Sequence, residues 1–520
     1  MSAGAYDSIV IGGGHNGLVC AAYLARGGRR VLLLEAAAAL GGAASTREFA
    51  PGFRVSACAH LLHLMPAALM RDLALEQHGL SFAAAALPSV ALAEDARHLA
   101  LGAADLSALA QASPADAAAL SAWRALLQRF AHALHPVLAD VPPRLGTDEW
   151  RNRRALLGLG WRLRRLGRTD MRELLRIGGM CVYDLLEERF RLPLLKGALA
   201  LDAVLGTNYG PRSPGTVISL LYRAAASRGS DALALPRGGL GALADSLAAA
   251  ARAAGAEIRT GAQVERILVK DDRVVGVALR SGEEIAAASV ASSADPKTTF
   301  LRLLGAEHLD AGFVRRVAQV RSRGLAAKLH LALERLPQFP GLAPAALRAR
   351  LVVAPSSDYV ERAYNHAKYE EFSAQPMLEV TIPSLADPTL APAGQHVMSV
   401  IVQYAPYTVK GGWDSQRAAL TEAVIATLSR YAPELRSTIR ASELLTPHDI
   451  EQQFRITGGH WHHAELALDQ FLMVRPVPGA AQYRTPVAGL FLCGAGSHPG
   501  GGVMGLAGRN AARELLRKAA

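Results

Sequence analysis

The stretch from Tyr6 to Glu35 constrains the fold more than any other part of the chain. A short apolar run precedes the glycines Gly12, Gly14 and Gly17, which have the spacing G-x-G-x-x-G. A helix-forming stretch and a second apolar run, Val31 to Leu34, follow them. Apolar runs of this length suit strands buried on both faces of a parallel sheet. The order of strand, glycine turn, helix and strand therefore predicts a Rossmann-type βαβ unit that binds an adenine dinucleotide.

The glycines and the acid that ends the second strand have separate roles in such a unit. The first glycine permits a tight turn, the second lets a pyrophosphate approach the backbone, and the third lets the helix pack closely. Free N–H groups at the start of the helix would face the phosphates. Glu35 can accept hydrogen bonds from both ribose hydroxyls, and its charge disfavours a 2′-phosphate. We therefore expect FAD or NAD rather than NADP; an ordinary βαβ turn without a nucleotide is the alternative.

Length and composition limit the class of protein. The chain has 520 residues, of which 51% are hydrophobic and 19% charged, so it should form a globular protein of two or more domains. Its four cysteines lie far apart and form no C-x-x-C, which fits a reducing compartment and offers neither a zinc framework nor a redox dithiol. The first strand leaves no room for a signal peptide, and no run of 18 apolar residues occurs. We expect a cytoplasmic protein that at most lies on the inner face of a membrane.

Glycines elsewhere narrow the nucleotide to FAD. Gly41 and Gly42 follow Glu35 closely, where flavoproteins bring the chain beside the FAD diphosphate and isoalloxazine. Residues 489–496 read as a buried strand ending in glycines, and a glycine-rich loop and a helix over residues 503–517 follow. A helix N-terminus aimed at the flavin would stabilise its reduced form. No second G-x-G-x-x-G unit is present, so we expect no separate domain for bound NAD(P)H.

Sequence motifs along nearly the whole chain resemble those of one family of flavoproteins. They are the N-terminal glycine motif, the segment ending in His78-Gly79-Leu80, and residues 211–221, 236–243, 457–476 and 489–502. With them the chain resembles the phytoene desaturase-like FAD-dependent oxidoreductases, most closely the pyridine nucleotide-disulphide oxidoreductase domain-containing protein 2 type. Many flavoproteins place an aspartate where this chain has Ala495, which fits the phytoene desaturase-like branch.

The resemblance implies an α/β fold of the amine oxidase/phytoene desaturase-like two-domain type. A discontinuous Rossmann-type FAD-binding domain would comprise residues 1–80, 232–300 and 484–520. An α+β substrate domain would comprise residues 81–231 and 301–483, with a helical segment from about 105 to 205. A valine at the position of Val264 contacts the adenine side in that family. The residues expected to bind FAD are Gly12, Gly14, His15, Asn16, Gly17, Glu35, Ala36, Gly41, Gly42, Ala43, Val264, Gly494, Ala495, Gly502, Val503 and Met504.

Arginines are concentrated between Arg151 and Arg176. This segment holds nine of them, with leucines and Trp161 interleaved. Such a composition suits an amphipathic helix that lies on an anionic bilayer surface, and a solvated helix with its apolar face in the core is an equal alternative. The net charge of +11 does not indicate nucleic-acid binding, because this basic segment is local and no recognition motif accompanies it.

A histidine-rich segment supplies the candidate catalytic residues. His460, His462 and His463 do not have a recognised zinc spacing, so we expect no metal. If the segment is extended, His460 and His462 share one face. In the resembling family this segment lines the flavin and substrate cavity, and a histidine at the position of His463 is usual. His463, His460 and Glu465 are therefore the candidates for an acid or base, and structural roles for all three are the alternative.

The leading hypothesis for function is an FAD-dependent oxidoreductase that acts on a lipophilic, polyene or isoprenoid-like substrate. Hydride would pass between a substrate carbon and flavin N5 in a desaturase, saturase or isomerase reaction. An amine or amino-acid oxidase, and a flavin-binding partner protein without turnover, are the alternatives. The electron acceptor (oxygen, a quinone or another) and the oligomeric state are left open. A long apolar tunnel beside the flavin would favour polyenes, and a short polar pocket would favour amines.

Overall fold

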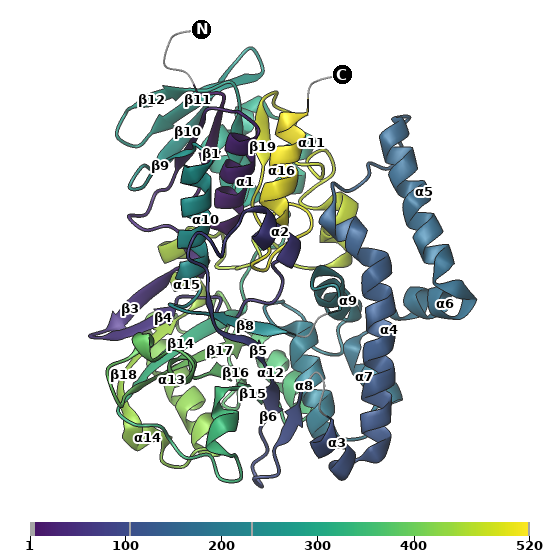
Figure 1. The fold of residues 1–520 in the computed structure, drawn as a ribbon, viewed down its shortest axis with the longest axis vertical. Helices are drawn as coiled ribbons and strands as arrows, with labels where there is room; N and C mark the ends of the chain where they lie inside the picture. The colour runs from purple at the N-terminus through teal and green to yellow at the C-terminus, as the bar shows by residue number, and fades with distance from the viewer. Residues whose placement is uncertain (1–5, 103–105, 230–231, 518–520) are drawn as a thin grey trace.

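The computed structural model describes residues 6–102, 106–229 and 232–517. Figure 1 shows a parallel sheet in one half of the molecule, a larger mixed sheet in the other, and a group of helices along one side. This α/β arrangement, with a Rossmann-type sheet and an α+β second half, is the predicted fold class. The predicted limits at residues 1, 105, 231 and 520 lie outside the described ranges.

The parallel sheet has five strands in the order β19-β13-β1-β2-β9. Its strands are β1 (Ser8–Ile11), β2 (Val31–Leu34), β9 (Glu257–Arg259), β13 (Val290–Ser292) and β19 (Leu490–Leu492). Both strands predicted in the N-terminal stretch are confirmed, and all their residues are buried. All five strands come from the three segments predicted for the FAD-binding domain.

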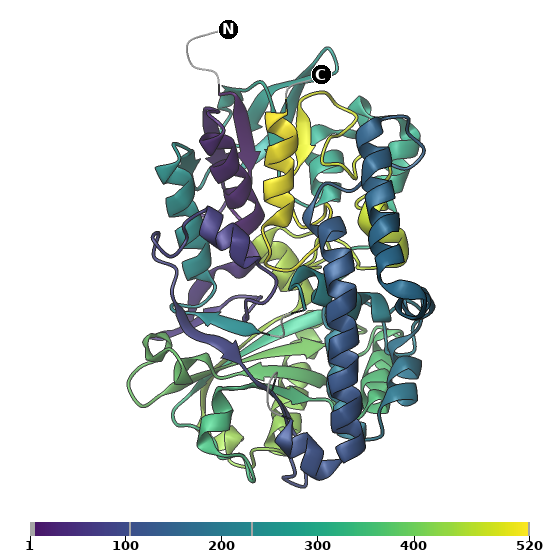
Figure 2. The ribbon, with the colours of Figure 1, turned by 45° about the vertical axis from the view of Figure 1, so that its right-hand side comes forward.

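Helices α1 (His15–Arg26), α10 (Gly241–Ala253) and α16 (Leu506–Leu516) cover one face of this sheet, and Figure 2 shows α1 and α16 side by side. The close approach depends on small residues. A Cβ on Gly17 would lie 2.0 Å from the Gly12 carbonyl oxygen, and a Cβ on Gly508 would lie 2.0 Å from that of Asn16. A side chain at Gly17 would push α1 away from the glycine turn, and a side chain at Gly508 would push α16 away from α1.

A second core lies on the other face of the parallel sheet. It includes the three-stranded sheet β10 (Val264–Lys270), β11 (Arg273–Leu279) and β12 (Glu284–Ala286). Helix α11 (Ala311–Ala318) also contributes, because Phe313 and Val317, one helical turn apart, are buried in the same cluster as Phe300. The predicted domain limit at residue 300 therefore falls within one packed core.

The mixed sheet has seven strands in the order β18-β14-β17-β16-β15-β6-β7. Its strands are β6 (Ser89–Ala91), β7 (Leu99–Leu101), β14 (Ala326–Leu333), β15 (Arg350–Val353), β16 (Met377–Thr381), β17 (His396–Gln403) and β18 (Ile439–Leu445). The helices that accompany it are α12 (Ser357–Ala367), α13 (Trp413–Ser429), α14 (Leu435–Thr438) and α15 (Pro447–Phe454). Between the two halves lie α2 (Ala67–Asp72) and two strand pairs, β3 (Thr46–Ala50) with β4 (Phe53–Ser56) and β5 (Phe82–Leu87) with β8 (Leu233–Pro236).

The segment predicted to be helical is helical. Its helices are α3 (Ser107–Ala112), α4 (Pro114–Ala139), α5 (Trp150–Arg165), α6 (Gly167–Ile177), α7 (Val182–Arg189) and α8 (Pro193–Val204), and α9 (Val217–Ala226) follows them. The prediction of a single amphipathic helix between Arg151 and Arg176 is wrong in one respect. Gly167 has a φ of +81° and separates α5 from α6. No helix in the described ranges has the length and apolar character needed to cross a bilayer.

Candidate functional site

Two glycine segments that are far apart in the sequence meet at the end of β1. Gly12 has a φ of +96°, which turns the chain towards α1. The Gly41 N–H donates a hydrogen bond of 2.9 Å to the Gly13 carbonyl, so the Gly41-Gly42 doublet lies beside the first motif. A Cβ on Gly14 would meet no atom within 4 Å, and one on Gly42 would meet only the Gly14 Cα, at 3.8 Å. Gly14 and Gly42 therefore border open space rather than packed protein.

The carboxylate of Glu35 is held at the edge of this space. One of its oxygens accepts a hydrogen bond of 2.6 Å from the Gly13 N–H, and the other accepts one of 2.7 Å from the Ala37 N–H. The Glu35 carbonyl accepts a bond of 2.8 Å from the Ala262 N–H, two residues before Val264 at the start of β10. The predicted ribose-binding acid, Ala36 after it and Val264 thus share one corner of the sheet.

Buried polar atoms near the glycine turn have no protein partner. His15 Nε2 and Asn16 Oδ1 form no hydrogen bond with any described residue. Burial lowers the pKa of His15 to about 4, so its imidazole is neutral at pH 7. Buried polar groups normally find partners, so these atoms indicate a polar ligand.

The C-terminal loop closes the same region. A Cβ on Gly494 would lie 2.2 Å from the Ser293 carbonyl oxygen, so glycine is needed where the loop crosses the end of β13. Ala495, Gly502, Val503 and Met504 follow, with Gly502 at a φ of +103°. The predicted helix over residues 503–517 begins later, at Leu506, because the left-handed Gly505 (φ +71°) ends the loop there.

Together these residues fit FAD. The predicted cofactor-binding residues from three chain segments lie at the carboxyl end of a parallel sheet, where α/β folds bind nucleotides. Gly12, Gly14, Gly41 and Gly42 would leave room for the diphosphate, Glu35 would hold the adenosine ribose, and residues 502–504 would lie beside the isoalloxazine. The individual contacts of these residues with FAD stay a prediction.

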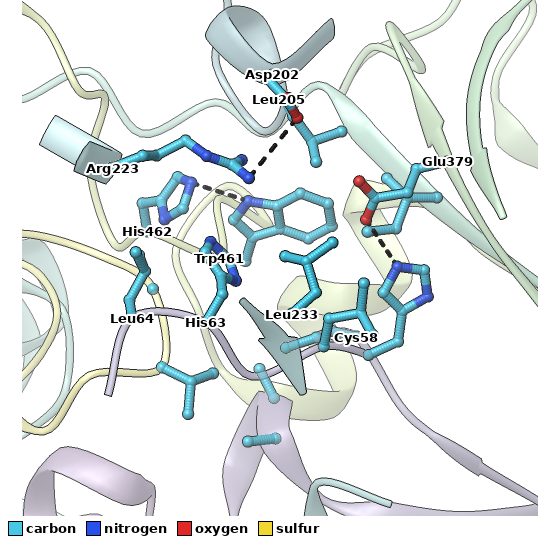
Figure 3. Close-up of a pocket in the computed structure, with 18 of the residues that line it drawn as sticks. Cys58, His63, Leu64, Asp202, Leu205, Arg223, Leu233, Glu379, Trp461 and His462 are labelled. Carbon is cyan, nitrogen blue, oxygen red and sulfur yellow. Dashed lines mark hydrogen bonds and ion pairs between the residues drawn. The ribbon is translucent and has the colours of Figure 1, made fainter. Parts of the chain in front are cut away.

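We call the residues predicted to bind FAD in the segments 12–17, 35–43 and 494–504 the FAD cradle. A cavity of about 150 Å³ lies beside this cradle. At one end it is lined by residues predicted to lie near the flavin or adjacent to them, His15, Ala43, Ala44, Gly502 and Val503. Its apolar wall includes Leu61, Leu64, Leu205, Leu233, Ile401 and Leu466. Its polar wall includes His60, His63, Asp202, Arg223, Arg350, Glu379, Trp461 and His462, several of which are labelled in Figure 3.

Ionised side chains form a connected network behind the polar wall. Arg350 donates hydrogen bonds of 2.5 Å to Glu379 and 2.7 Å to Asp202. His60 joins the network through its two nitrogens, with Nε2 at 2.8 Å from Glu379 and Nδ1 at 2.7 Å from the Lys328 Nζ. Since an ammonium can only donate, Nδ1 accepts and the proton of a neutral His60 is on Nε2.

Burial shifts the pKa values of this network in different directions. It lowers the pKa of Lys328 to about 7, and burial together with the nearby Lys328 lowers the pKa of His60 to about 4. Burial opposes ionisation of Glu379, but Arg350 and the His60 hydrogen bond hold its pKa well below the usual value. At neutral pH the wall therefore contains ionised Glu379 and Arg350, neutral His60, and a lysine close to its titration point.

The predicted catalytic residues lie next to the cavity rather than on its wall. The chain turns at His460, because the His463 N–H donates to the His460 carbonyl at 2.7 Å, so the extended arrangement is wrong. Glu465 accepts hydrogen bonds from the backbone N–H groups of Asn208 and Leu466 and lies 3.5 Å from His460 Nε2. None of the three residues lines the cavity, which His462 and Trp461 do. Their catalytic role stays a prediction that the cavity wall does not favour.

Most residues of the polar wall were not predicted from the sequence. His60, His63, Arg223, Arg350 and Glu379 come from segments without a recognised motif. A signal was available for two members of the network, because Lys328 and Glu379 interrupt otherwise apolar strands, and buried ionisable groups concentrate at functional sites. No three His, Cys, Asp or Glu side chains in the described ranges are grouped so as to hold a metal ion.

Comparisons with known proteins agree with this geometry. A family model described as flavin containing amine oxidoreductase matches residues 17–516. Pyridine nucleotide-disulfide oxidoreductase domain-containing protein 2 of Rattus norvegicus is 37% identical, over 98% of this chain and 93% of that protein. A component of the limonene dehydrogenase of Castellaniella defragrans is 28% identical, over 98% and 94%. A neurosporene-forming phytoene desaturase of Cereibacter sphaeroides is 29% identical, over 52% and 51%.

Among solved structures, an oxidoreductase from Methanosarcina mazei has the same fold, with a TM-score of 0.61, 17% identity, and coverage of 98% of this chain and 100% of that one. The predicted resemblance to the phytoene desaturase-like flavoproteins, and to the domain-containing protein 2 type among them, is confirmed. FAD is likewise confirmed as the cofactor. The chain is an FAD-dependent oxidoreductase and belongs to the family of flavin containing amine oxidoreductases.

Proposed function

We propose that the protein oxidises or reduces a carbon–carbon bond in a compact, lipophilic, isoprenoid-like substrate. The main support for this proposal is the apolar wall of the cavity of about 150 Å³, which Gly502 and Val503 of the C-terminal loop also line. An apolar cavity of about 150 Å³ accommodates a molecule of the size of benzene. A ring or a short isoprenoid unit matches that size, and a long polyene does not. The name of the limonene dehydrogenase relative supports the same class of substrate.

The bound flavin would supply the acceptor or donor of a hydride, and the protein would supply orientation and a water-poor site. Leu64, Leu205 and Leu233 would hold the apolar body of the substrate against the flavin end of the cavity. His60 is neutral at pH 7, and its Nδ1 and Nε2 connect the cavity to Lys328 and Glu379. This chain of groups gives a substrate proton a route to buried bases.

An amine substrate is less well supported. The ammonium group of an amine needs a carboxylate or an aromatic face that is free to receive it. The two carboxylates on the described wall, Asp202 and Glu379, both accept hydrogen bonds from Arg350. A cationic amine would also face Arg223 across the same cavity.

The test is anaerobic reduction of the purified holoenzyme by a panel of compounds. We expect bleaching of the flavin by a cyclic or short acyclic terpenoid, and reoxidation when oxygen or a quinone is added. Primary amines should leave the flavin oxidised. Bleaching by amines with release of hydrogen peroxide would identify an amine oxidase instead. A flavin that no compound bleaches, and whose dithionite-reduced form no compound reoxidises, would favour a binding protein without turnover.

We also propose that α5 lies on an anionic membrane surface. Trp150, Leu157 and Trp161 are 70%, 67% and 65% exposed, and their spacing of seven and four residues places them on one face of the helix. The expectation that the apolar face of this helix packs in the core does not hold for these residues. Arginines flank the face at Arg154 and Arg165, so it combines apolar insertion with attraction to anionic headgroups. Contact with a bilayer would place the protein near lipophilic substrates.

A further inference from the structure

We propose that Arg223 binds a carboxylate of the substrate, so that the substrate is a lipophilic acid. The inference rests on the proposed function, since it specifies one end of the proposed substrate. Arg223 lies on α9, and Figure 3 shows its side chain on the cavity wall beside Asp202 and His63. The side chain is 25% exposed although α9 is otherwise largely buried.

The guanidinium of Arg223 has no hydrogen-bond partner among the described residues. Its nearest acid is Asp202, with 3.7 Å between Nη2 and Oδ1, which is longer than a hydrogen bond. The same Asp202 oxygen already accepts a bond of 2.7 Å from Arg350. Arg223 and Asp202 thus form only a long ion pair. A guanidinium has five N–H donors in a planar fork that matches a carboxylate, and those of Arg223 have no hydrogen-bond partner among the described residues.

The charges around Arg223 leave it free for an anion. Arg350 forms hydrogen bonds with both Asp202 and Glu379, which account for the two carboxylates on the wall. Arg223 is therefore not needed to neutralise a buried acid that lacks another partner. Lys328, behind the wall, adds positive rather than negative charge when it is protonated. The local balance is neutral to positive, which favours a single carboxylate and disfavours an ammonium group.

The neighbours of Arg223 describe the rest of the ligand. His63 also lines the cavity, and burial followed by the nearby Arg223 lowers its pKa to about 3, so it is neutral and can donate one N–H. Leu205, Trp461 and the C-terminal-loop residues Gly502 and Val503 also line the cavity. A cavity of about 150 Å³ has no room for a diphosphate with an isoprenoid chain.

The test is equilibrium titration of the oxidised holoenzyme with three ligands of the same size: cyclohexanecarboxylate, cyclohexanecarboxamide and cyclohexylamine. Binding is followed by the change in flavin absorbance, so no turnover is needed. We expect the carboxylate to bind roughly 10- to 100-fold more tightly than the amide, and the amine most weakly. Arg223→Met should remove the advantage of the carboxylate over the amide, and Arg223→Lys should keep part of it.

Arg228→Met is the matched control, because Arg228 is exposed beyond the end of α9 and does not line the cavity. Flavin content and thermal unfolding establish that each variant is folded, and Arg223→Lys keeps the test valid if the methionine variant is not. The proposal is overturned if the wild type binds none of the ligands, if it binds carboxylate and amide equally, or if Arg223→Met weakens both equally. Failure of terpenoids both to bleach the oxidised flavin and to reoxidise the reduced flavin would reject the proposed function and leave these titrations interpretable.

Discussion

A substitution at Gly14 should weaken cofactor binding without affecting folding. A Cβ there meets nothing within 4 Å, yet the position lies where the pyrophosphate of FAD would approach the backbone. We expect Gly14→Ala to fold normally and to bind FAD about tenfold more weakly or worse, because the added methyl group fills the space of the phosphate. The affinity is measured by reconstituting the apoprotein with FAD.

Gly160→Ala is the control for Gly14, because Gly160 also faces open space but lies in the exposed helix α5. It should keep the affinity of the wild type for FAD. Equal affinity of the Gly14→Ala variant and the wild type would show that FAD does not approach the chain at this turn.

Lys328 should make the stability of the protein depend on pH. The groups facing it are His60, Glu379 and Cys58, and burial lowers its pKa from 10.5 to about 7. Between these two values the unfolded chain holds a proton that the folded chain lacks, so the free energy of unfolding rises with pH in this window. The contribution is at most about 1.4 kcal/mol per pH unit, and Lys328→Met should remove it.

Thermal unfolding at pH 7 and pH 9 tests this prediction. The unfolding temperature of the Lys328→Met variant should exceed that of the wild type at pH 7, and the difference should shrink at pH 9. Lys270→Met, which changes an exposed lysine on β10, should leave the difference between the two pH values as in the wild type. Parallel behaviour of Lys328→Met and wild type would contradict a lysine that is neutral above pH 7.

At the scale of elements, α5 should act as a membrane-binding helix. The protein should sediment with vesicles that contain anionic phosphatidylglycerol and much less with neutral phosphatidylcholine vesicles, since each arginine near the surface contributes about 1 kcal/mol. Replacing Leu157 and Trp161 together by serine should release the protein from the anionic vesicles. Salt should weaken the binding of the wild type.

Tyr369→Ser provides the control for α5, because Tyr369 is 67% exposed just beyond α12. This variant should bind vesicles like the wild type. If the wild type remains in the supernatant with anionic vesicles, or if the double serine variant binds equally well, the exposed face of α5 has another role.

Sequence patterns predicted regular elements well where one periodicity dominated. The second apolar run of the N-terminal stretch, Val31 to Leu34, forms a strand with the predicted limits. The break between α5 and α6 and the late start of α16 were not predicted. Both depend on a glycine in the left-handed conformation, Gly167 or Gly505. The sequence alone does not distinguish a glycine at a helix boundary from a glycine inside a helix.

The whole molecule should depend on FAD for its stability. The cradle combines residues 12–17, 35–43 and 494–504, so the cofactor would hold three distant segments together. A ligand that binds only the folded chain stabilises it by about 2.7 kcal/mol at a free concentration 100 times its Kd. We expect the unfolding temperature of the apoprotein to rise steadily with added FAD and to stay unchanged with NADP. An unfolding temperature independent of FAD would contradict a cradle formed by all three segments.

The cavity shows what the sequence could not predict. Local motifs located the FAD cradle, because its glycines and its acid follow one another closely along the chain. The polar wall instead brings His60, Asp202, Arg223, Arg350 and Glu379 together from separate elements of both sequence halves. Except for Glu379, which interrupts a largely apolar strand, each of them alone resembles an ordinary surface residue, and only the tertiary packing reveals that they lie beside one another.

The strand order of the parallel sheet also affects how the protein is made. β1 lies between β2 and β13, and β13 completes its pairing only with β19, at residues 490–492. A ribosome adding roughly 5 to 20 residues per second needs roughly 25 to 100 seconds between the first strand and the last. During that time the flavin-binding half is an unfinished sheet with an exposed apolar edge. FAD can therefore be inserted only at the end of synthesis, and chaperones that cover β13 until β19 arrives should raise the yield of active protein.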